Sequence, residues 1–569
     1  MKKNILLIIL SVFCIPLFGQ RGLPYLKQQG GASQLIVDGK AFLVLGGELG
    51  NSSASAEKDI ERIFPKLQSM GLNTVLVPAY WDLIEPEEGV FSFSLIDKTI
   101  NQARKNELKV VFLWFGAWKN SMSCYAPLWF KKDYEKYPRA YTKEGKPLEI
   151  ASSFSKNVFQ ADNKAFAEFM KHISSVDKED NTVIMIQIEN EIGMLEDARD
   201  YSEVANTLFN AQVPEALINY LTKHKKELYP QMIEKWGKQE FKTKGTWQEI
   251  FGEDLYTDEI FMAWNYALYI EQLAQTARSI HNLPLYVNAA MNSRNRQPGE
   301  YPSAGPLAHL IDVWNCGAPS IDFLAPDLYD KGFSDWVKQY HLQNNPLFIP
   351  EVRLGNNNGV QAFYVFGEHD AIGYSPFSIE NGSVESSSPL VQAYSKLKEL
   401  MPVLTDYQGT GKMNGLLFDQ ENKERILFFD DLKLTCKHFF TLPWDPRATD
   451  GSVWPEGGGL IIRLNKDEYL IAGSGLVIEF DKKGEKSNIQ AKELGEDGFI
   501  SQGGNDNKQQ LWNGGLRAGI GTVDEIRIDD TGKFIPLRRL NGDQTHQGRH
   551  VRIGVDDFSI LHVRLYEYK

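Results

Sequence analysis

The chain has 569 residues, of which 42% are hydrophobic and 24% charged, the composition of a globular protein with two or three domains. Its formal net charge of −13 is spread along the sequence rather than gathered in blocks, which argues against a nucleic acid partner. We therefore expect a neutral substrate. Aromatic residues make up 12% of the chain, and carbohydrate sites use aromatic faces on which a sugar ring can stack.

The first twenty residues predict an export signal. Residues 1–20 carry two lysines, then an apolar run of about a dozen residues, then the small Gly19, as secretory signal peptides do. The run is too short to span a bilayer, and no later segment approaches the ~20 apolar residues of a spanning helix. We therefore expect a secreted protein, periplasmic or extracellular, without a membrane span. Lipidation at Cys14 is the less favoured alternative, because Phe13 precedes it where such signals have Gly or Ala.

Strand-like and helix-like patterns alternate from Phe42 to about Met401. The helix-like segments space their apolar residues at three and four, and eight units of this kind predict an α/β fold, a (β/α)8 barrel. A doubly wound open sheet is the alternative, but it would need a glycine-rich phosphate loop after its first strand, which residues 46–48 do not provide. The eight expected strands are 42–48, 73–81, 109–115, 183–189, 283–290, 321–329, 346–352 and 371–377.

We expect the barrel to occupy residues 21–404, with an insertion at about 194–280 between its fourth and fifth strands. This insertion has helical periodicity and is expected to cover the barrel mouth; the alternative is an ornament on the outer ring of helices. Short alternating strands with Gly- and Asp-rich turns follow, and they predict an antiparallel β-sandwich, jelly-roll-like, over residues 405–569. Candidate stacking residues there are Trp444, Trp454 and Trp512, although core packing is the commoner role of tryptophan.

Two buried strands of the predicted barrel end in glutamates. The segment VIMIQIENEIG (183–193) places Glu191 just after the fourth strand, and PLFIPEVR (346–353) places Glu351 at the end of the seventh. Charge is costly at such positions, so these glutamates are expected to serve chemistry. A retaining glycosidase needs one acid to protonate the leaving oxygen and one carboxylate to attack the sugar, ~5–5.5 Å apart. Asn190 is placed to bond the sugar 2-hydroxyl.

Two motifs carry a resemblance to a known family. GLNTVLVPAYWDLIEPEEGVFSFSLID (71–97) and QIENEIG (187–193) resemble the retaining β-galactosidases of glycoside hydrolase family 35. The resemblance implies that Glu191 is the acid/base, that Asn190 binds the sugar and that Glu351 is the nucleophile.

The resemblance also implies further sugar contacts. Tyr329, at the end of the sixth strand, resembles the tyrosine that hydrogen-bonds the nucleophile in this clan, and Glu48 and Tyr80 match residues on the first and second strands. The chain departs from the family at Ile192, at residues 84–86 and after the third strand. Contacts in that last region are therefore assigned by position alone, to Trp114, Trp118 and Asn120.

The function implied is that of a secreted exo-β-galactosidase that removes terminal non-reducing β-galactose from oligo- or polysaccharides. The pattern resembles a bacterial branch of the family that carries a C-terminal β-domain of unknown function, some of whose members act on galactosyl side chains of plant xyloglucan. Three alternatives stay open: a family 42 β-galactosidase, which shares the pattern W-x-x-x-E-P-x-x-G; another retaining β-glycosidase such as a β-glucosidase or endo-glycanase; and a catalytically dead glycan-binding barrel. We expect no cofactor and no metal, because the ten histidines show no HxxxH or HxH pairing with carboxylates, and no cofactor loop is evident. Oligomeric state is not predicted.

Overall fold

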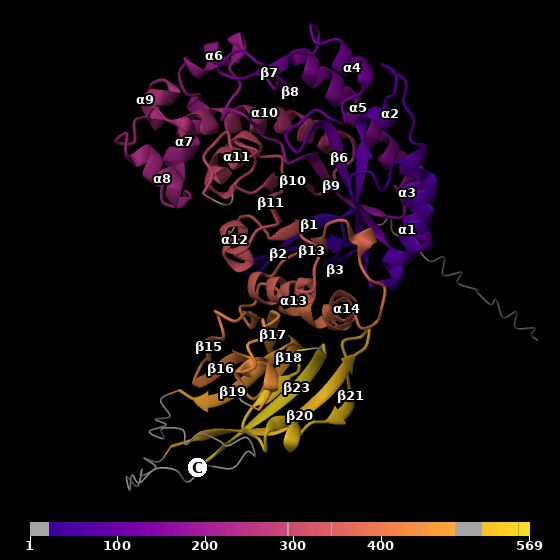
Figure 1. Ribbon diagram of the computed structural model, residues 1–569, viewed down its shortest axis with the longest axis vertical. Helices are drawn as coiled ribbons and strands as arrows, with labels where there is room; N and C mark the ends of the chain where they lie inside the picture. The colour runs from indigo at the N-terminus through magenta and orange to yellow at the C-terminus, as the bar shows by residue number, and fades with distance from the viewer. Residues whose placement is uncertain (1–21, 293–294, 343, 443, 484–514, 556) are drawn as a thin grey trace, which may run out of the picture.

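The computed structural model describes residues 22–292, 295–342, 344–442, 444–483, 515–555 and 557–569. Figure 1 shows an upper body of strands and helices and a lower body of antiparallel sheets, with α13 and α14 lying between them. The expected signal peptide and Trp512 lie outside the described residues. Among the described helices, none is long and apolar enough to cross a membrane.

Eight parallel strands form the central sheet of the upper body and confirm the predicted (β/α)8 barrel. The sheet closes beside Glu48, where Leu76 N donates to Gly47 O at 2.9 Å and Leu49 N donates to Leu76 O at 3.0 Å. In the order in which they are hydrogen-bonded, the strands are β4 (Val44–Leu45), β13 (Gly373–Pro376), β12 (Phe348–Val352), β11 (Phe323–Leu328), β10 (Leu285–Ala290), β9 (Val183–Asn190), β6 (Lys109–Lys119) and β5 (Thr74–Tyr80).

Helices surround this sheet, and α1 buries one apolar stripe against it. The stripe of α1, at Ile60, Ile63, Phe64 and Leu67, is the three-and-four pattern expected from the sequence. The helices of the barrel are α1 (Glu57–Ser69), α2 (Trp81–Ile84), α3 (Ser94–Lys105), α4 (Leu128–Lys132), α5 (Lys156–Val176), α10 (Leu255–Ile280), α11 (Ile311–Gly317), α12 (Phe333–Tyr340), α13 (Asn358–His369) and α14 (Pro389–Tyr407).

The segment expected as an insertion has two different parts. Four short helices, α6 (Glu203–Phe209), α7 (Glu215–Lys223), α8 (Pro230–Gly237) and α9 (Trp247–Phe251), gather at the upper left in Figure 1. The following helix, α10, packs on α5 instead, and its Tyr269 hydroxyl donates to Asp162 at 2.8 Å. α10 therefore serves as the ring helix between β9 and β10, and the excursion from the barrel ends near residue 254 rather than near residue 280.

Two small antiparallel sheets were not predicted. One consists of β1 (Tyr25–Gln29), β2 (Ala32–Val37) and β3 (Lys40–Phe42); the other of β7 (Arg139–Tyr141) and β8 (Pro147–Ala151). In the first sheet the buried Gln34 side chain donates to Thr405 O at 2.6 Å and to Gln408 Oε1 at 3.1 Å. This sheet is thereby tied to α14 and to the residue that follows it.

The lower body consists of two antiparallel sheets, consistent with the predicted β-sandwich. The six-stranded sheet has the order β14 (Met413–Phe418), β17 (Gly457–Arg463), β18 (Glu468–Ser474), β23 (Ser559–Tyr568), β20 (Arg517–Ile528) and β21 (Phe534–Arg539). The four-stranded sheet has the order β15 (Glu424–Phe429), β16 (Leu432–His438), β19 (Leu476–Lys482) and β22 (Val551–Ile553).

The six-stranded sheet buries both of its faces. Ile461 and Ile471 belong to the core between the two sheets, whereas Leu460 and Ala472 belong to the same core cluster as the barrel. Arg425 also forms two hydrogen bonds of 2.9 Å with the Glu368 carboxylate of α13. Two bodies that share a core in this way are packed more tightly than domains joined by a linker alone.

Candidate active site

Glu191 follows β9 directly and is held by two neighbouring strands. Its backbone N donates to Asn288 Oδ1 of β10 at 3.0 Å, and Asn120, just after β6, donates through Nδ2 to Glu191 Oε2. Glu191 itself has φ 45°, a left-handed conformation that is rare for a residue with a side chain. The chain therefore bends at Glu191, and its carboxyl lies among residues at the ends of neighbouring barrel strands.

Glu351 lies within β12, near its end, and is 4% exposed. The Tyr329 hydroxyl donates to Glu351 Oε1, while Oε2 accepts from no protein group among the described residues. The structure thus brings Tyr329 to Glu351, and the charge of Glu351 acts directly on Glu191. The two glutamates that the sequence singles out lie in one cluster.

Glu48 joins this cluster at the point where the barrel closes. Its carboxyl is fully buried beside the Glu351 carboxyl and accepts from no protein donor among the described residues. Burial raises the pKa of Glu48 well above its usual range, and the charges of Glu351 and Glu191 raise it further, against the opposing charge of Lys119. These surroundings favour the protonated form of Glu48.

Two members of the cluster were missed by the sequence analysis, Lys119 and Asp327. Lys119 ends β6 with 3% exposure, and its ammonium lies 5.2 Å from the centre of the Phe115 ring. Asp327 is paired with Glu351 across β11 and β12, and its Oδ2 accepts from Asn288 Nδ2 at 2.6 Å. Asp327 carries the same signal as Glu351, a charge within an expected buried strand. Lys119 lies four residues beyond the expected end of its strand.

The two central glutamates have different surroundings. Burial, followed by the charge of Glu351, raises the pKa of Glu191 to about 7, while Lys119, Asp327 and Asn120 act in the opposite direction. A carboxyl with this pKa carries a proton part of the time at neutral pH and can both donate and accept it. Two carboxyls whose environments separate their protonation states are what acid-assisted sugar transfer needs.

Asn190 and Trp118 present unbonded polar atoms at the strand ends. Both side chains are fully buried, yet the Asn190 amide and the Trp118 indole N–H bond no protein group among the described residues. Tyr266 and Tyr269 of α10 pack edge-on against the Trp118 ring and fix it. Buried polar groups normally find a partner, so these atoms are suited to bond a ligand.

Glu189, two residues before Glu191, has a structural role. Its carboxylate accepts from Ala117 N at 3.1 Å and Trp118 N at 2.7 Å, and it is paired with the buried Asp162 of α5. Gly116 lies directly over this pair: a Cβ there would be 2.6 Å from Glu189 Oε1 and 2.7 Å from Asp162 Oδ1. The pair therefore supports the end of β6, from which Lys119 and Asn120 enter the cluster.

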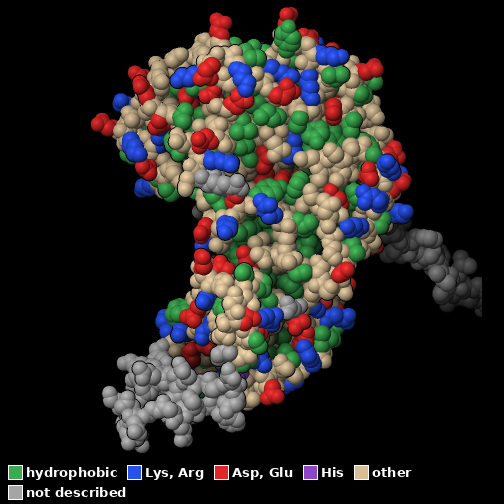
Figure 2. Space-filling view, viewed as in Figure 1, with side chains coloured by type: hydrophobic (Ala, Val, Ile, Leu, Met, Phe, Trp, Pro, Cys, Tyr) green, Lys and Arg blue, Asp and Glu red, His purple; other side chains and the backbone are tan. Residues whose placement is uncertain are grey.

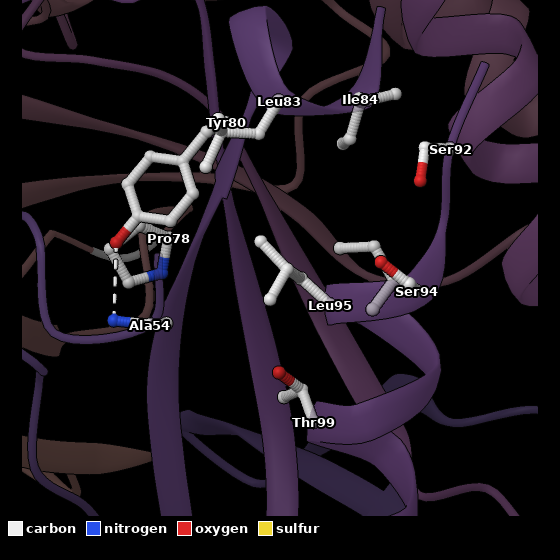
Figure 3. A pocket seen from close by; sticks show the side chains of 10 residues that line it. Ala54, Pro78, Tyr80, Leu83, Ile84, Ser92, Ser94, Leu95 and Thr99 are labelled. Carbon is white, nitrogen blue, oxygen red and sulfur yellow. Dashed lines mark hydrogen bonds between the residues drawn. The ribbon is translucent and has the colours of Figure 1, made fainter. Parts of the chain in front are cut away.

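Trp114 and Tyr80 are not brought to the cluster. Trp114 points outward from β6, where its indole donates to Asp162 at 2.9 Å and its ring stacks on Phe169. Tyr80 packs against Phe115, and its hydroxyl accepts from Ala54 N at 3.3 Å. Figure 3 shows Tyr80 beside a cavity of about 30 Å³, which is water-sized and far too small for a sugar. Trp114 was assigned by its position along the strand, which does not tell to which side of the sheet a side chain points, and Tyr80 was assigned from the family resemblance.

The pattern W-x-x-x-E-P-x-x-G is explained by local structure rather than by sugar contact. Glu85 is 1% exposed; it accepts from the Trp81 indole at 2.9 Å and from Gly89 N at 2.7 Å. Gly89 has φ +81°, which glycine adopts without strain. This motif therefore stabilises the turn after β5.

A (β/α)8 barrel with a proton-carrying Glu191 and a tyrosine-bonded Glu351 at its strand ends has the makeup of a glycoside hydrolase. The family comparison agrees with that class. Residues 51–265 match the family 42 glycoside hydrolase model, described as Beta-galactosidase, and residues 390–552 match a domain of unknown function, DUF5597. Residues 51–265 are thus similar to a family of glycoside hydrolases. No curated protein matches the chain.

Several solved structures are similar at low identity. The β-galactosidase of the Antarctic haloarchaeon Halorubrum lacusprofundi is 14% identical with a TM-score of 0.43, over 62% of this chain and 58% of that one. The β-galactosidase of the psychrophilic Marinomonas ef1 is 14% identical with a TM-score of 0.44, over 64% and 61%. An endo-1,4-β-mannanase from Rhizomucor miehei is 14% identical with a TM-score of 0.42, over 66% and 99%. The chain thus spans about three fifths of the length of these β-galactosidases.

The family match corrects the predicted resemblance to family 35. The matched region, residues 51–265, contains both motifs on which that resemblance was based, and it is a family 42 model that matches it. The motifs misled because one of them forms the Trp81–Glu85–Gly89 turn and the other is a strand end carrying Asn190 and Glu191. Both features belong to the barrel, so they do not separate the two families. With family 35 set aside, the expectation of xyloglucan side chains loses its basis.

Proposed function

We propose that the protein is a retaining β-galactosidase that removes terminal non-reducing β-galactose from oligo- or polysaccharides in two displacement steps. The observation that carries the mechanism is the pairing of Glu191, whose pKa burial and the charge of Glu351 raise to about 7, with Glu351, whose Oε1 accepts from the Tyr329 hydroxyl. The observation that supports galactose is the β-galactosidase model matching residues 51–265.

In the first step Glu191 donates its proton to the glycosidic oxygen while Glu351 attacks the anomeric carbon. The bond to the leaving alcohol breaks, and a glycosyl ester forms on Glu351. Tyr329 orients the attacking carboxylate, and Asn190 supplies an amide for the sugar 2-hydroxyl. Lys119 balances the negative charge of the cluster and keeps its ammonium available to a sugar hydroxyl.

In the second step the ionised Glu191 takes a proton from water, and that water attacks the anomeric carbon from the face that the leaving group vacated. The ester breaks, the Glu351 carboxylate is released and the galactose keeps its β configuration. Two inversions at one carbon give net retention.

We also propose that the protein is exported before it acts. The basic, apolar and small-residue pattern of residues 1–20 supports this assignment. A cell fractionation that finds the full-length chain in the cytoplasm would reject it.

The test of function is a panel of 4-nitrophenyl β-glycosides with product analysis. A site that hydrogen-bonds the axial 4-hydroxyl of galactose should give a kcat/KM at least ~10³ above that for the β-glucoside. Proton NMR of the first turnovers should show β-galactose. Glu351→Gln is the inactive control, and Asn120→Ala should narrow the ratio. Comparable rates on the two glycosides would reject galactose specificity, whereas early α-galactose would reject retention.

A further inference from the structure

Asp327 has a contact that the two-glutamate mechanism leaves unused. It is 1% exposed, lies beside Glu351 across β11 and β12, and its carboxyl hydrogen-bonds the carboxyl of Glu191. Asn288 bonds both partners, because its Nδ2 donates to Asp327 Oδ2 at 2.6 Å while its Oδ1 accepts from Glu191 N at 3.0 Å. One amide therefore fixes the positions of both carboxyls.

Two carboxyls in hydrogen-bond contact away from water cannot both be ionised, so the pair must hold a proton. Glu191 is the better anion of the two, because the Asn120 amide donates to it and the charge of Lys119 acts on it. The groups whose charges act on Asp327 are carboxyls, led by Glu351, and burial raises its pKa well above the usual range. Asp327 is thus the member that keeps the proton.

The position of that proton follows from the bonding of the two oxygens. Oδ2 of Asp327 already accepts from Asn288, whereas Oδ1 is buried and accepts from no protein group among the described residues. If Oδ1 of Asp327 carries the proton, Asp327 loses no existing hydrogen bond. It gains a charge-assisted hydrogen bond to the Glu191 carboxylate. The titratable groups that face Asp327 are Glu48, Glu191, Glu351, Tyr286, Tyr329 and Tyr340.

We propose that Asp327 is a positioning residue that stays protonated through the catalytic cycle and donates its Oδ1 hydrogen to Glu191. This inference rests on the proposed role of Glu191 as acid/base. When Glu191 gives its proton to the leaving group, the carboxylate that remains is stabilised by Asn120 and Asp327 until water returns a proton. Asp327 transfers nothing itself, and its effect is to set the acidity of Glu191.

The first experiment compares the pH profiles of kcat/KM for Asp327→Ala and Asp327→Asn, using the aryl β-glycoside that the wild type cleaves best. Without a donor, the Glu191 carboxylate loses one charge-assisted hydrogen bond, so the basic limb of Asp327→Ala should move upward by about one to two pH units. The amide of Asp327→Asn can donate in place of the acid and should hold the limb close to its wild-type position. Lower activity with unmoved limbs in both variants would show a merely structural role and overturn the proposal.

Asp370→Asn is the matched control. Burial also raises the pKa of Asp370, to about 6, but this residue lies between α13 and β13, and its φ of 49° suits asparagine. Its replacement should leave the basic limb in place. A shift as large as that of Asp327→Ala would show that the limb responds to any buried carboxyl and would overturn the proposal.

The second experiment needs no activity, so it separates this inference from the proposed function. Carbon-13 NMR of protein labelled at the aspartate carboxyl should show one resonance that Asp327→Asn removes and that does not titrate between pH 5 and 9. A resonance that moves to the ionised position in that range would overturn the proposal, whatever glycoside the enzyme cleaves. Failure of the wild type to cleave any aryl β-glycoside, with a non-titrating resonance, would reject the function alone.

Discussion

The basic limb of the kcat/KM profile, along which Glu191 loses its proton, gives the sharpest test of the mechanism. An ordinary glutamate with a pKa of 4.5 would be protonated in ~1 molecule of 300 at pH 7, whereas a pKa of about 7 keeps ~1 in 2 protonated. The environment of Glu191 therefore raises the population of the acid form by ~150-fold. The first step needs that form, so we expect kcat/KM to fall with rising pH through about 7, by ~10-fold for each further unit.

The assay compares two aryl β-galactosides in the wild type and in Glu191→Ala. A 4-nitrophenyl leaving group needs less help from an acid than an alkyl alcohol does, and 2,4-dinitrophenol needs almost none. We expect the basic limb to vanish in Glu191→Ala on the dinitrophenyl substrate, while the loss of activity on poorer leaving groups stays large. A basic limb that persists in this variant would refute the reasoning and assign the acid to another carboxyl.

Three further outcomes follow from the same geometry. Glu351→Gln should lower kcat by at least ~10³, and azide should yield only the inverted α-galactosyl azide from this variant, so β-azide by NMR would exchange the two roles. Lys119→Met removes a charge that lowers the pKa of Glu191, so the basic limb of the kcat/KM profile should move upward; a limb that moves downward would contradict the placement of this ammonium. Trp114→Phe breaks the bond to Asp162 and should lower the melting temperature with KM unchanged, whereas a raised KM in a fully folded variant would return Trp114 to the sugar site.

The sequence predicts the barrel well because parallel strands are buried on both faces and appear as continuous apolar runs. It also singles out Glu191 and Glu351, since a charge at the end of such a run is costly. The same reasoning applied to IDFLAPDLY (321–329) would have found Asp327, whose carboxyl lies inside the run. A charge inside an apolar run is the same signal, but the prediction considered only charges at the ends of such runs.

Other parts of the site could not be read from the sequence for physical reasons. Lys119 belongs to the site only because β6 continues four residues beyond its apolar run. The Glu189 carboxyl holds this extension by accepting from the backbone N of Ala117 and of Trp118. Trp114 lies in the same strand but faces α5, and alternation alone does not say which set of residues faces inward. Both outcomes depend on contacts between residues far apart in the chain.

Charges of both signs are mixed on the face that Figure 2 shows. In Figure 2 basic and acidic side chains are interspersed over the visible face of both bodies, without a continuous basic stripe. This matches the spread of charge along the sequence.

The strand order of the six-stranded sheet has a consequence for the timing of folding. β23, residues 559–568, lies between β18 and β20, so the middle of the sheet is supplied by a segment that the ribosome makes after all the other strands of that sheet. Leu460 and Ala472 of the same sheet belong to the core cluster that the sheet shares with the barrel. The sheet that carries this shared core is therefore incomplete until β23 has joined β18 and β20.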